Sequence, residues 1–324
     1  MHAIQAFIEK TGGPEVIQWR EVELPAPGPG EVQMRQEAVG LNFIDTYFRT
    51  GLYPAPLPSG LGMEAAGVIE TVGEGVNQFK PGDRVAYTGL PGAYASARNV
   101  MAAALFALPD AIDTRTAAAA LLKGATAESL AERCAPVAAG GWAMVPAAAG
   151  GVGRLMVQWL KARGVKVIGT VGDEGKMEVA KQDGADLVFL SHAEDLADQV
   201  RAATGGEGVA VCYDGVGAAT WESSLKSMAR RGTLVSFGNA SGPVTGVNLG
   251  VLASHGSLYV TRPTMFDYYR DPAERAAGSA KLWEMIASGK VKVSIGQTYA
   301  LKDAAQAHRD LEARRTTGST LLLP

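Results

Sequence analysis

The chain has 324 residues, 47% of them hydrophobic, so it can bury a large core and is long enough to form two domains. Its formal net charge is -3 and its lysines and arginines are dispersed, which excludes a broad basic surface for nucleic acid or anionic membranes. The two cysteines form no CxxC pair, and the N-terminus lacks the charged and apolar regions of a secretory signal. We therefore expect a cytoplasmic protein from a reducing compartment, with no membrane span.

The N-terminal part of the chain, up to about residue 120, alternates short predicted strands with turns. Proline and glycine mark two of these turns, at residues 25–30 and 80–83. This pattern predicts a β-rich domain.

From about residue 125 to about residue 260, short apolar strands alternate with helical stretches. The later strands of this region are predicted at residues 165–171, 184–190, 209–214 and 232–238. The alternation predicts a doubly wound parallel sheet, so the fold class is α/β. The C-terminal segment is predicted to contain a helix at 276–288, a strand near Tyr299, a helix at 303–311 and a last strand at 319–323, and these elements could rejoin the β-rich domain.

A glycine-rich turn joins an apolar strand that begins at Trp142 to an amphipathic helix. The spacing Ala148-x-Gly150-x-x-Gly153 fits the dinucleotide fingerprint, with alanine at its first position. Gly150 lets the backbone approach a pyrophosphate, and Gly153 lets the helix pack closely on the strand. Because the N–H groups at the start of the helix attract negative charge, the turn predicts a bound nicotinamide dinucleotide.

The end of the next strand bears on which nicotinamide cofactor is bound. A preference for NAD usually needs a carboxylate there, but the strand closes with Thr170-Val-Gly172 and carries no acid. Lys176 follows and lies near enough in sequence to pair with a 2′-phosphate. This favours NADPH, with the alternative that Lys176 is a solvated helix lysine.

Six short motifs are distributed along the chain: Asn42-Phe-Ile-Asp-Thr-Tyr47, Gly60-Leu-Gly-Met-Glu-Ala-Ala-Gly67, Pro81-Gly-Asp-Arg-Val85, Ala147-Ala-Ala-Gly-Gly-Val-Gly153, Ser236-Phe-Gly-Asn239 and Tyr259-Val-Thr-Arg-Pro263. In this order and spacing they resemble the quinone oxidoreductase branch of the medium-chain dehydrogenase/reductase superfamily, the zeta-crystallin relatives. The resemblance implies a GroES-like catalytic domain over residues 1–122, completed by 265–324, and a Rossmann NADPH-binding domain over 123–264, with an active-site cleft where they meet. It also implies a homodimer, for which residues 257–260 offer an apolar strand edge.

The same resemblance implies an enzyme that needs no metal. The superfamily's zinc-binding members have cysteine and histidine ligands where this sequence has Asn42 and Met63. Without a Lewis acid, reduction of a simple ketone is hard, whereas hydride added to a quinone gives a delocalised phenolate. A small quinone is therefore the expected substrate.

Residue roles follow from the resemblance. Near the substrate and the nicotinamide we expect Asn42 and Asp45, with Tyr47 and Tyr53 as aromatic walls; Asp45 could instead be a local helix cap, and Tyr53 could simply pack in its loop. The remaining cofactor-binding candidates are Thr126, Gly150, Gly151, Val152, Gly153, Thr170, Gly172, Lys176, Ser191, Phe237, Gly238, Asn239, Ala240, Arg262 and Arg314.

The sequence departs from the family at several of these places. Pro146 stands where the family has histidine and removes a backbone donor from the strand end. Ser191 and Gly215 replace a tyrosine and a serine of close relatives. These changes concern the adenosine half of the cofactor more than the hydride-transfer end.

Two other functions stay open. The acceptor could be an α,β-unsaturated carbonyl, with Tyr47 or Tyr53 as proton donor. Alternatively, the chain could be a low-turnover NADPH-binding or RNA-binding protein of the zeta-crystallin type, although its charge does not indicate RNA binding.

Overall fold

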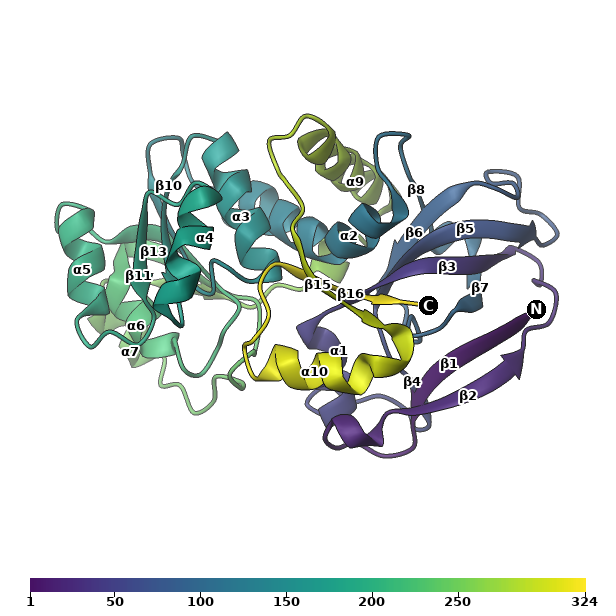
Figure 1. Cartoon of the computed structure of the whole chain (residues 1–324). Helices are drawn as coiled ribbons and strands as arrows, with labels where there is room; N and C mark the ends of the chain where they lie inside the picture. Colours follow the sequence, from purple (N-terminus) through teal and green to yellow (C-terminus); the bar gives the residue numbers. More distant parts are fainter. The chain divides into compact units, whose positions relative to one another are not determined.

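The computed structural model describes residues 1–324, which fold into two compact units. Unit 1 comprises Met1–Lys123 and Val293–Pro324, and unit 2 comprises Gly124–Lys292. The chain passes from one unit to the other within α2 (Thr114–Glu128), and it returns after α9 (Pro272–Ala287) (Figure 1). The predicted β-rich domain and the predicted α/β class are both confirmed.

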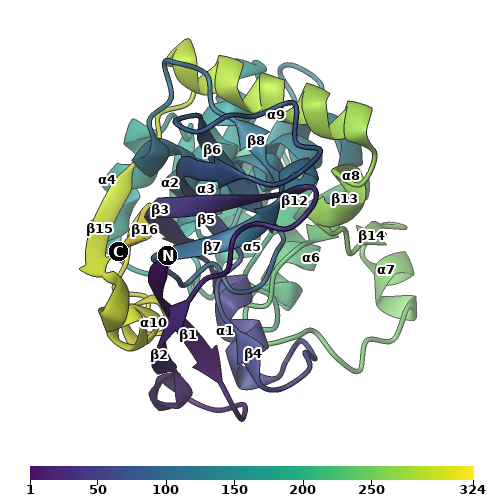
Figure 2. The same ribbon diagram turned by 90° about the vertical axis from the view of Figure 1, so that its right-hand side faces the viewer.

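Unit 1 is built from two β-sheets. A seven-stranded sheet runs in the order β15-β16-β3-β5-β6-β8, with β7 paired to β3, and a three-stranded sheet runs β2-β1-β4 (Figure 2). The strands are β1 (His2–Ile8), β2 (Gln18–Glu23), β3 (Glu31–Leu41), β4 (Ser59–Gly60), β5 (Glu64–Val72), β6 (Arg84–Thr88), β7 (Ala97–Met101), β8 (Phe106–Ala107), β15 (Ile295–Ala300) and β16 (Ser319–Leu323).

The core of unit 1 lies against these sheets. Val32, Met34, Val39 and Leu41 of β3 are buried and pack with side chains of the neighbouring strands. The C-terminal strand β16 pairs antiparallel with β3, so the last residues of the chain complete the sheet that the first residues begin. The predicted return of the C-terminal segment to the β-rich domain is therefore confirmed for β15 and β16.

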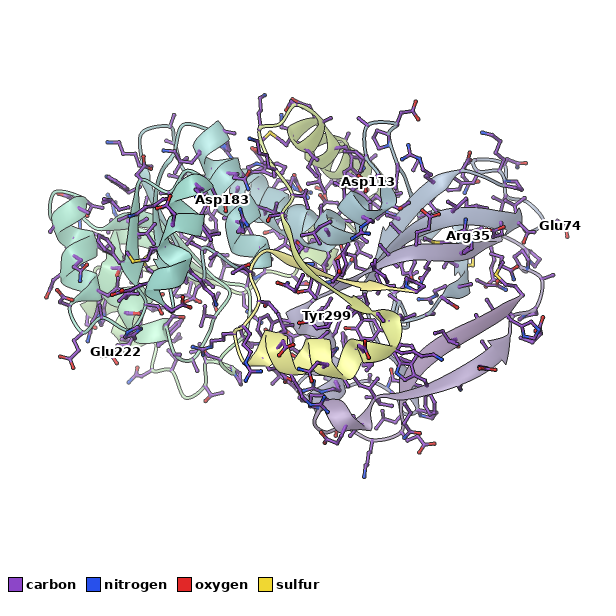
Figure 3. All side chains as sticks on the ribbon, in the orientation of Figure 1. Arg35, Glu74, Asp113, Asp183, Glu222 and Tyr299 are labelled. Atoms are coloured by element: carbon purple, nitrogen blue, oxygen red, sulfur yellow. The ribbon has the colours of Figure 1, made fainter.

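Two helices of unit 1 matter for the site. Helix α1 (Phe43–Thr50) begins after Asn42 and ends at Gly51, whose φ of 83° is the left-handed conformation that glycine adopts at helix ends. Helix α10 (Ala304–Glu312) follows β15, and the hydroxyl of Tyr299 donates to Asp310 at 2.9 Å, which ties the helix to the strand (Figure 3).

Unit 2 contains a six-stranded, wholly parallel sheet in the order β11-β10-β9-β12-β13-β14. The strands are β9 (Trp142–Val145), β10 (Lys166–Val171), β11 (Leu187–Leu190), β12 (Val209–Asp214), β13 (Met228–Ser236) and β14 (Tyr259–Thr261). The order reverses between β9 and β12, and such a switch point is where doubly wound sheets bind ligands.

Helices connect these parallel strands. They are α3 (Gly151–Ala162), α4 (Met177–Gln182), α5 (Leu196–Ala203), α6 (Trp221–Ser227) and α7 (Gly250–Ser254), followed by α8 (Met265–Tyr268) and α9. Helix α3 shows why the fold forms locally, because Leu155, Met156 and Trp159 of its apolar face are buried. No helix of the chain is both long and apolar enough to cross a membrane.

The division between the units differs from the expected domain boundary. Residues 265–292 were expected with the GroES-like domain but lie in unit 2. Within that unit the Tyr269 hydroxyl donates to Glu128 at 3.0 Å, and a Cβ added to Gly124 would lie 2.4 Å from a methyl carbon of Leu282. Helices α8 and α9 therefore pack on the end of α2, and only residues from Val293 onward return to unit 1.

Candidate functional site

The turn between β9 and α3 has the geometry that the glycine spacing predicts. Gly150 caps the helix in an extended conformation and offers no side chain to the first-turn N–H groups. A Cβ added to Gly153 would lie 2.2 Å from the carbonyl oxygen of Ala147, so only glycine allows this close packing. Ala148 is buried, and a Cβ on Gly169 of β10 would lie 2.8 Å from its methyl group.

The carboxyl end of β10 lies next to this turn. Ala148 N donates to the carbonyl of Thr170 at 3.0 Å, so the turn and the strand end are hydrogen-bonded. Gly172 has open space where a Cβ would be. Lys176 follows in a short 3-10 turn, where its ammonium lies 3.4 Å from Asp173.

The loop after β13 is held by an arginine that follows β14. Arg262 donates to the carbonyl oxygens of Ser236 and Gly238 at 2.6 and 3.2 Å. With its amide turned to satisfy both groups, Asn239 accepts from the same guanidinium at 3.0 Å. In this structure Arg262 therefore shapes the loop formed by residues 237–240.

The neighbouring turn after β12 is held by a buried carboxylate that the sequence analysis did not single out. Asp214 accepts from the N–H groups of Val216 and Gly217 and from the hydroxyls of Thr220 and Ser224. Next to it, Gly238 could carry no side chain, because a Cβ would lie 2.2 Å from the carbonyl oxygen of Gly215. Sequence reading alone could have noted Asp214 as an acid at a strand end.

Most predicted cofactor-binding residues thus follow the carboxyl ends of adjacent parallel strands. Those brought to this edge of the unit 2 sheet are Gly150, Gly151, Val152, Gly153, Thr170, Gly172, Lys176, Ser191, Phe237, Gly238, Asn239, Ala240 and Arg262. Thr126 lies on α2, in the part of that helix that belongs to unit 2, and Arg314 lies in unit 1 after α10, with a φ of 60°.

In unit 1, Asn42 is held by two carboxylates. Its backbone N–H donates to Asp45 Oδ2 and its side-chain Nδ2 donates to Glu64 Oε2, each at 2.9 Å. Glu64 is fully buried and also accepts from the N–H of Leu122 at 2.6 Å, while the Lys123 ammonium lies 3.4 Å away. The orientation of Asn42 is therefore fixed from both sides.

Asp45 is fully buried, and its two oxygens have different surroundings. Oδ2 accepts from the N–H of Asn42 and from the hydroxyl of Tyr94, whereas Oδ1 has no hydrogen-bond partner. Burial raises the pKa of Asp45 to about 7, against the opposing effect of its two hydrogen bonds and of Lys123. Asp45 does cap α1, as the alternative interpretation expected, but the cap uses only Oδ2.

A buried chain of side chains continues from Asp45. The Tyr94 hydroxyl lies 2.8 Å from Nε2 of His308, and Nδ1 of His308 lies 2.9 Å from the Arg49 guanidinium. Arg49 forms a two-point ion pair with Glu312 at 2.6 and 3.0 Å. Burial and, to a smaller extent, the charge of Arg49 lower the pKa of His308 to about 3, so the imidazole is neutral.

Sequence reasoning missed this connected group of four buried side chains, Asp45, Tyr94, His308 and Arg49, which we call the buried polar chain and which ends at the exposed carboxylate of Glu312. Asp45 and Arg49 lie four residues apart on α1, but no local spacing connects them with Tyr94, in the segment before β7, or with His308 on α10. An arginine and a histidine on the apolar faces of two helices were the only available signals.

Tyr47 and Tyr53 form an aromatic cluster beside α1. Their ring centroids are 5.2 Å apart in an edge-to-face arrangement, and Phe48 meets Tyr53 at 5.8 Å. Tyr47 is buried and Tyr53 is partly buried. Both predicted arrangements of Tyr53, as a wall and as a packed loop residue, agree with this geometry.

The positions that correspond to zinc ligands carry Asn42 and Met63, both buried. No group of three or more histidine, cysteine, aspartate and glutamate side chains is arranged to hold a metal ion. A surface groove of about 450 Å³ in unit 1, lined by Arg20, Glu31 and Arg98 among others, contains none of the predicted site residues.

Comparison with known proteins identifies the family. Residues 28–110 match the alcohol dehydrogenase GroES-like domain, and residues 151–275 match the zinc-binding dehydrogenase domain. A quinone oxidoreductase of Pseudomonas aeruginosa is 52% identical over 97% of each chain, and a 2-haloacrylate reductase of a Burkholderia species is 41% identical over 98% of each. The crystal structure of Escherichia coli quinone oxidoreductase complexed with NADPH superposes with a TM-score of 0.96 at 48% identity, covering 99% of this chain and 100% of that one. The chain belongs to the quinone oxidoreductase family of the medium-chain dehydrogenase/reductase superfamily.

Proposed function

We propose that the protein is an NADPH-dependent quinone reductase in which unit 2 binds the cofactor and unit 1 supplies the side chains that hold the acceptor. The observation that carries this proposal is the near-complete structural match to a quinone oxidoreductase crystallised with NADPH. When bound, NADPH supplies the hydride that reduces the quinone.

The residues of unit 2 fit a dinucleotide. The first turn of α3 presents its N–H groups without a side-chain cap, and Gly153 permits the close approach of helix and strand. Gly172 leaves open space at the end of β10, and Lys176 supplies a cation there. A 2′-phosphate needs that combination of room and positive charge, which supports NADPH over NADH.

Unit 1 supports a reaction without a Lewis acid. An amide and a thioether, Asn42 and Met63, stand where zinc ligands would be needed. A quinone can be reduced without such a metal, because its reduced form delocalises the negative charge over the ring. Catalysis then depends mainly on orienting the acceptor, for which Asn42, Tyr47 and Tyr53 are the proposed contacts.

Steady-state kinetics with 1,4-benzoquinone and 9,10-phenanthrenequinone, with NADPH and NADH compared, tests the proposal. We expect oxidation of NADPH with both quinones and a kcat/KM for NADPH at least about tenfold above that for NADH. Turnover that persists after dialysis against a chelator, with no stoichiometric metal in the protein, would support a reaction that needs no metal ion. Absence of NADPH oxidation with every quinone would refute the proposal.

A second candidate is reduction of an activated carbon–carbon double bond, which the 2-haloacrylate reductase among the relatives favours. This reaction needs a proton at the carbon next to the activating group. Including 2-chloroacrylate and an enone in the same assay separates the two functions, since a kcat/KM higher for these acceptors than for quinones would select the second.

Three finer expectations also remain proposals. Homodimerisation is supported by the edge strand β14, where Tyr259 is 61% exposed and Val260 38%, and by Leu249 nearby, which is 75% exposed. Light scattering of the purified protein checks this state. A cytoplasmic location is supported by the two cysteines, Cys134 and Cys212, which form no disulfide, and it is checked by cell fractionation. RNA binding is an alternative that the net charge of -3 does not indicate, and it is checked by a salt-dependent filter assay.

A further inference from the structure

The buried polar chain of unit 1 has a defined hydrogen-bond direction. A guanidinium has only donors, so Nδ1 of His308 must accept from Arg49. A neutral imidazole carries one hydrogen, which is then on Nε2 and points to the oxygen of Tyr94. The Tyr94 hydroxyl in turn donates to Asp45 Oδ2, so the three hydrogen bonds that lead from Arg49 through His308 and Tyr94 all donate in the direction of Asp45.

This direction determines where Asp45 can hold a proton. Oδ2 already accepts two hydrogen bonds, from the N–H of Asn42 and from Tyr94. Oδ1 is buried and has no partner, so a proton on this carboxyl group resides on Oδ1. Burying a charged carboxylate with one unpaired oxygen costs more free energy than burying the neutral acid, so the environment favours the protonated form.

The charged groups around Asp45 come from several elements. Lys123 on α2 favours the ionised form and Glu64 on β5 disfavours it. Tyr94, from the segment before β7, favours the ionised form through its hydrogen bond. Beyond Tyr94, the charge of Arg49 is paired with Glu312, and His308 is neutral. Desolvation outweighs the favourable interactions, and the acid form persists to near-neutral pH.

We propose that Asp45 is the proton donor of the reaction, acting through Oδ1, and that Tyr94 and His308 are positioning residues that hold its other oxygen. This inference rests on the proposed function. Addition of a hydride to a quinone leaves an oxyanion that needs one proton. The O–H bond of Asp45 breaks, and its proton moves to that oxyanion through one water molecule, because the buried Oδ1 is not exposed to direct contact. Asp45 remains as a carboxylate whose Oδ2 keeps both donors, and solvent returns the proton before the next turnover.

The pH dependence of kcat with a quinone, measured from about pH 5 to about pH 9, tests the donor role. In the wild-type protein kcat falls above about pH 7, as Asp45 ionises. Asp45→Asn lowers kcat about 100-fold below that pH. It also removes the fall of kcat above about pH 7, which we call the alkaline limb of the pH profile. NADPH binding, followed by fluorescence, should change by less than about threefold in the same variant.

Two further variants test the positioning residues. Tyr94→Phe removes a hydrogen bond that lowers the pKa of Asp45, so the alkaline limb moves up by about one pH unit. His308→Gln keeps an N–H donor for Tyr94 and should leave the limb within about half a unit of the wild-type position. The matched control is Tyr87→Phe, which removes another fully buried hydroxyl of unit 1, one that donates to Gln36 and has no contact with Asp45. The control should keep the wild-type limb.

Infrared spectroscopy gives a readout that does not depend on turnover. The wild-type protein should show a carboxylic acid carbonyl band that disappears as the pH rises through about 7, and Asp45→Asn should lack it. An active wild-type protein without this band, or an alkaline limb abolished by Tyr53→Phe but retained in Asp45→Asn, would overturn the inference. A wild-type protein that oxidises no NADPH with any quinone would instead overturn the proposed function, whatever the infrared result.

Discussion

The candidate sites of the two units consist of different kinds of chemical groups. At the carboxyl edge of the unit 2 sheet, backbone amides, carbonyls and glycines dominate, as at Gly150, Gly153 and Gly238. In unit 1, ionisable side chains are buried together, as in Asp45 and His308. A surface of backbone dipoles provides fixed partial charges that do not titrate, whereas buried acids and bases can exchange protons. Under the proposed function, cofactor binding would depend on shape in unit 2, and proton transfer would depend on pKa in unit 1.

The strongest test of this difference is the pH dependence of stability that the buried groups produce. Folding raises the pKa of Asp45 from 3.8 to about 7, so the unfolded chain ionises first and the free energy of unfolding falls as pH rises between these values. Folding lowers the pKa of His308 from 6.5 to about 3, so the unfolded chain binds a proton first and the free energy of unfolding falls as pH drops between these values. The two effects oppose each other between about pH 4 and about pH 6.5.

Single substitutions should separate the opposed effects. In Asp45→Asn the His308 contribution remains, and stability should rise with pH in that window by about 1.4 kcal/mol per unit more steeply than in the wild type. In His308→Gln the Asp45 contribution remains, and stability should fall with rising pH by a similar amount. Urea unfolding at a series of pH values measures both slopes. Asp110→Asn, at an exposed carboxylate of unit 1, is the control. Parallel curves of stability against pH for the wild type, Asp45→Asn and His308→Gln would contradict the assigned pKa changes.

A glycine substitution tests the shape-dependent site of unit 2. Gly153→Val places a side chain where a Cβ alone would lie 2.2 Å from the Ala147 carbonyl, and it should destabilise the protein by about 3 kcal/mol and abolish NADPH binding. Gly172→Ala is the matched control for stability, because nothing lies within 4 Å of its added Cβ. Thermal unfolding and NADPH fluorescence titration provide the measurements. Equal stability of the two variants would show that close packing at Gly153 is not required.

The contrast between the units also explains how much the sequence could predict. The strand at residues 209–214 was predicted with the bounds of β12, and the glycine turn was recognised, because both signals lie within a few consecutive residues. The buried polar chain joins Asp45, Tyr94 and His308, which are far apart in sequence. Their contact depends on how α10 packs against the other elements of unit 1. The expected domain boundary at residue 265 differs from the observed division at Val293 for a similar reason. The sequence of α9 does not reveal which unit its apolar face packs against.

The smallest expected effect concerns the only side-chain charge assigned to cofactor choice in unit 2. Lys176→Glu should raise the Kd for NADPH about tenfold and leave the Kd for NADH within about twofold, because only NADPH carries a 2′-phosphate. Lys181→Glu, at an exposed lysine of α4, changes the net charge by the same amount and should leave both affinities unchanged. Fluorescence titration at two salt concentrations measures the four affinities, and the NADPH difference should shrink at high salt. Equal loss of NADPH and NADH affinity in Lys176→Glu would instead mean that the ion pair of Lys176 with Asp173 supports the loop, and that backbone geometry alone accommodates the 2′-phosphate.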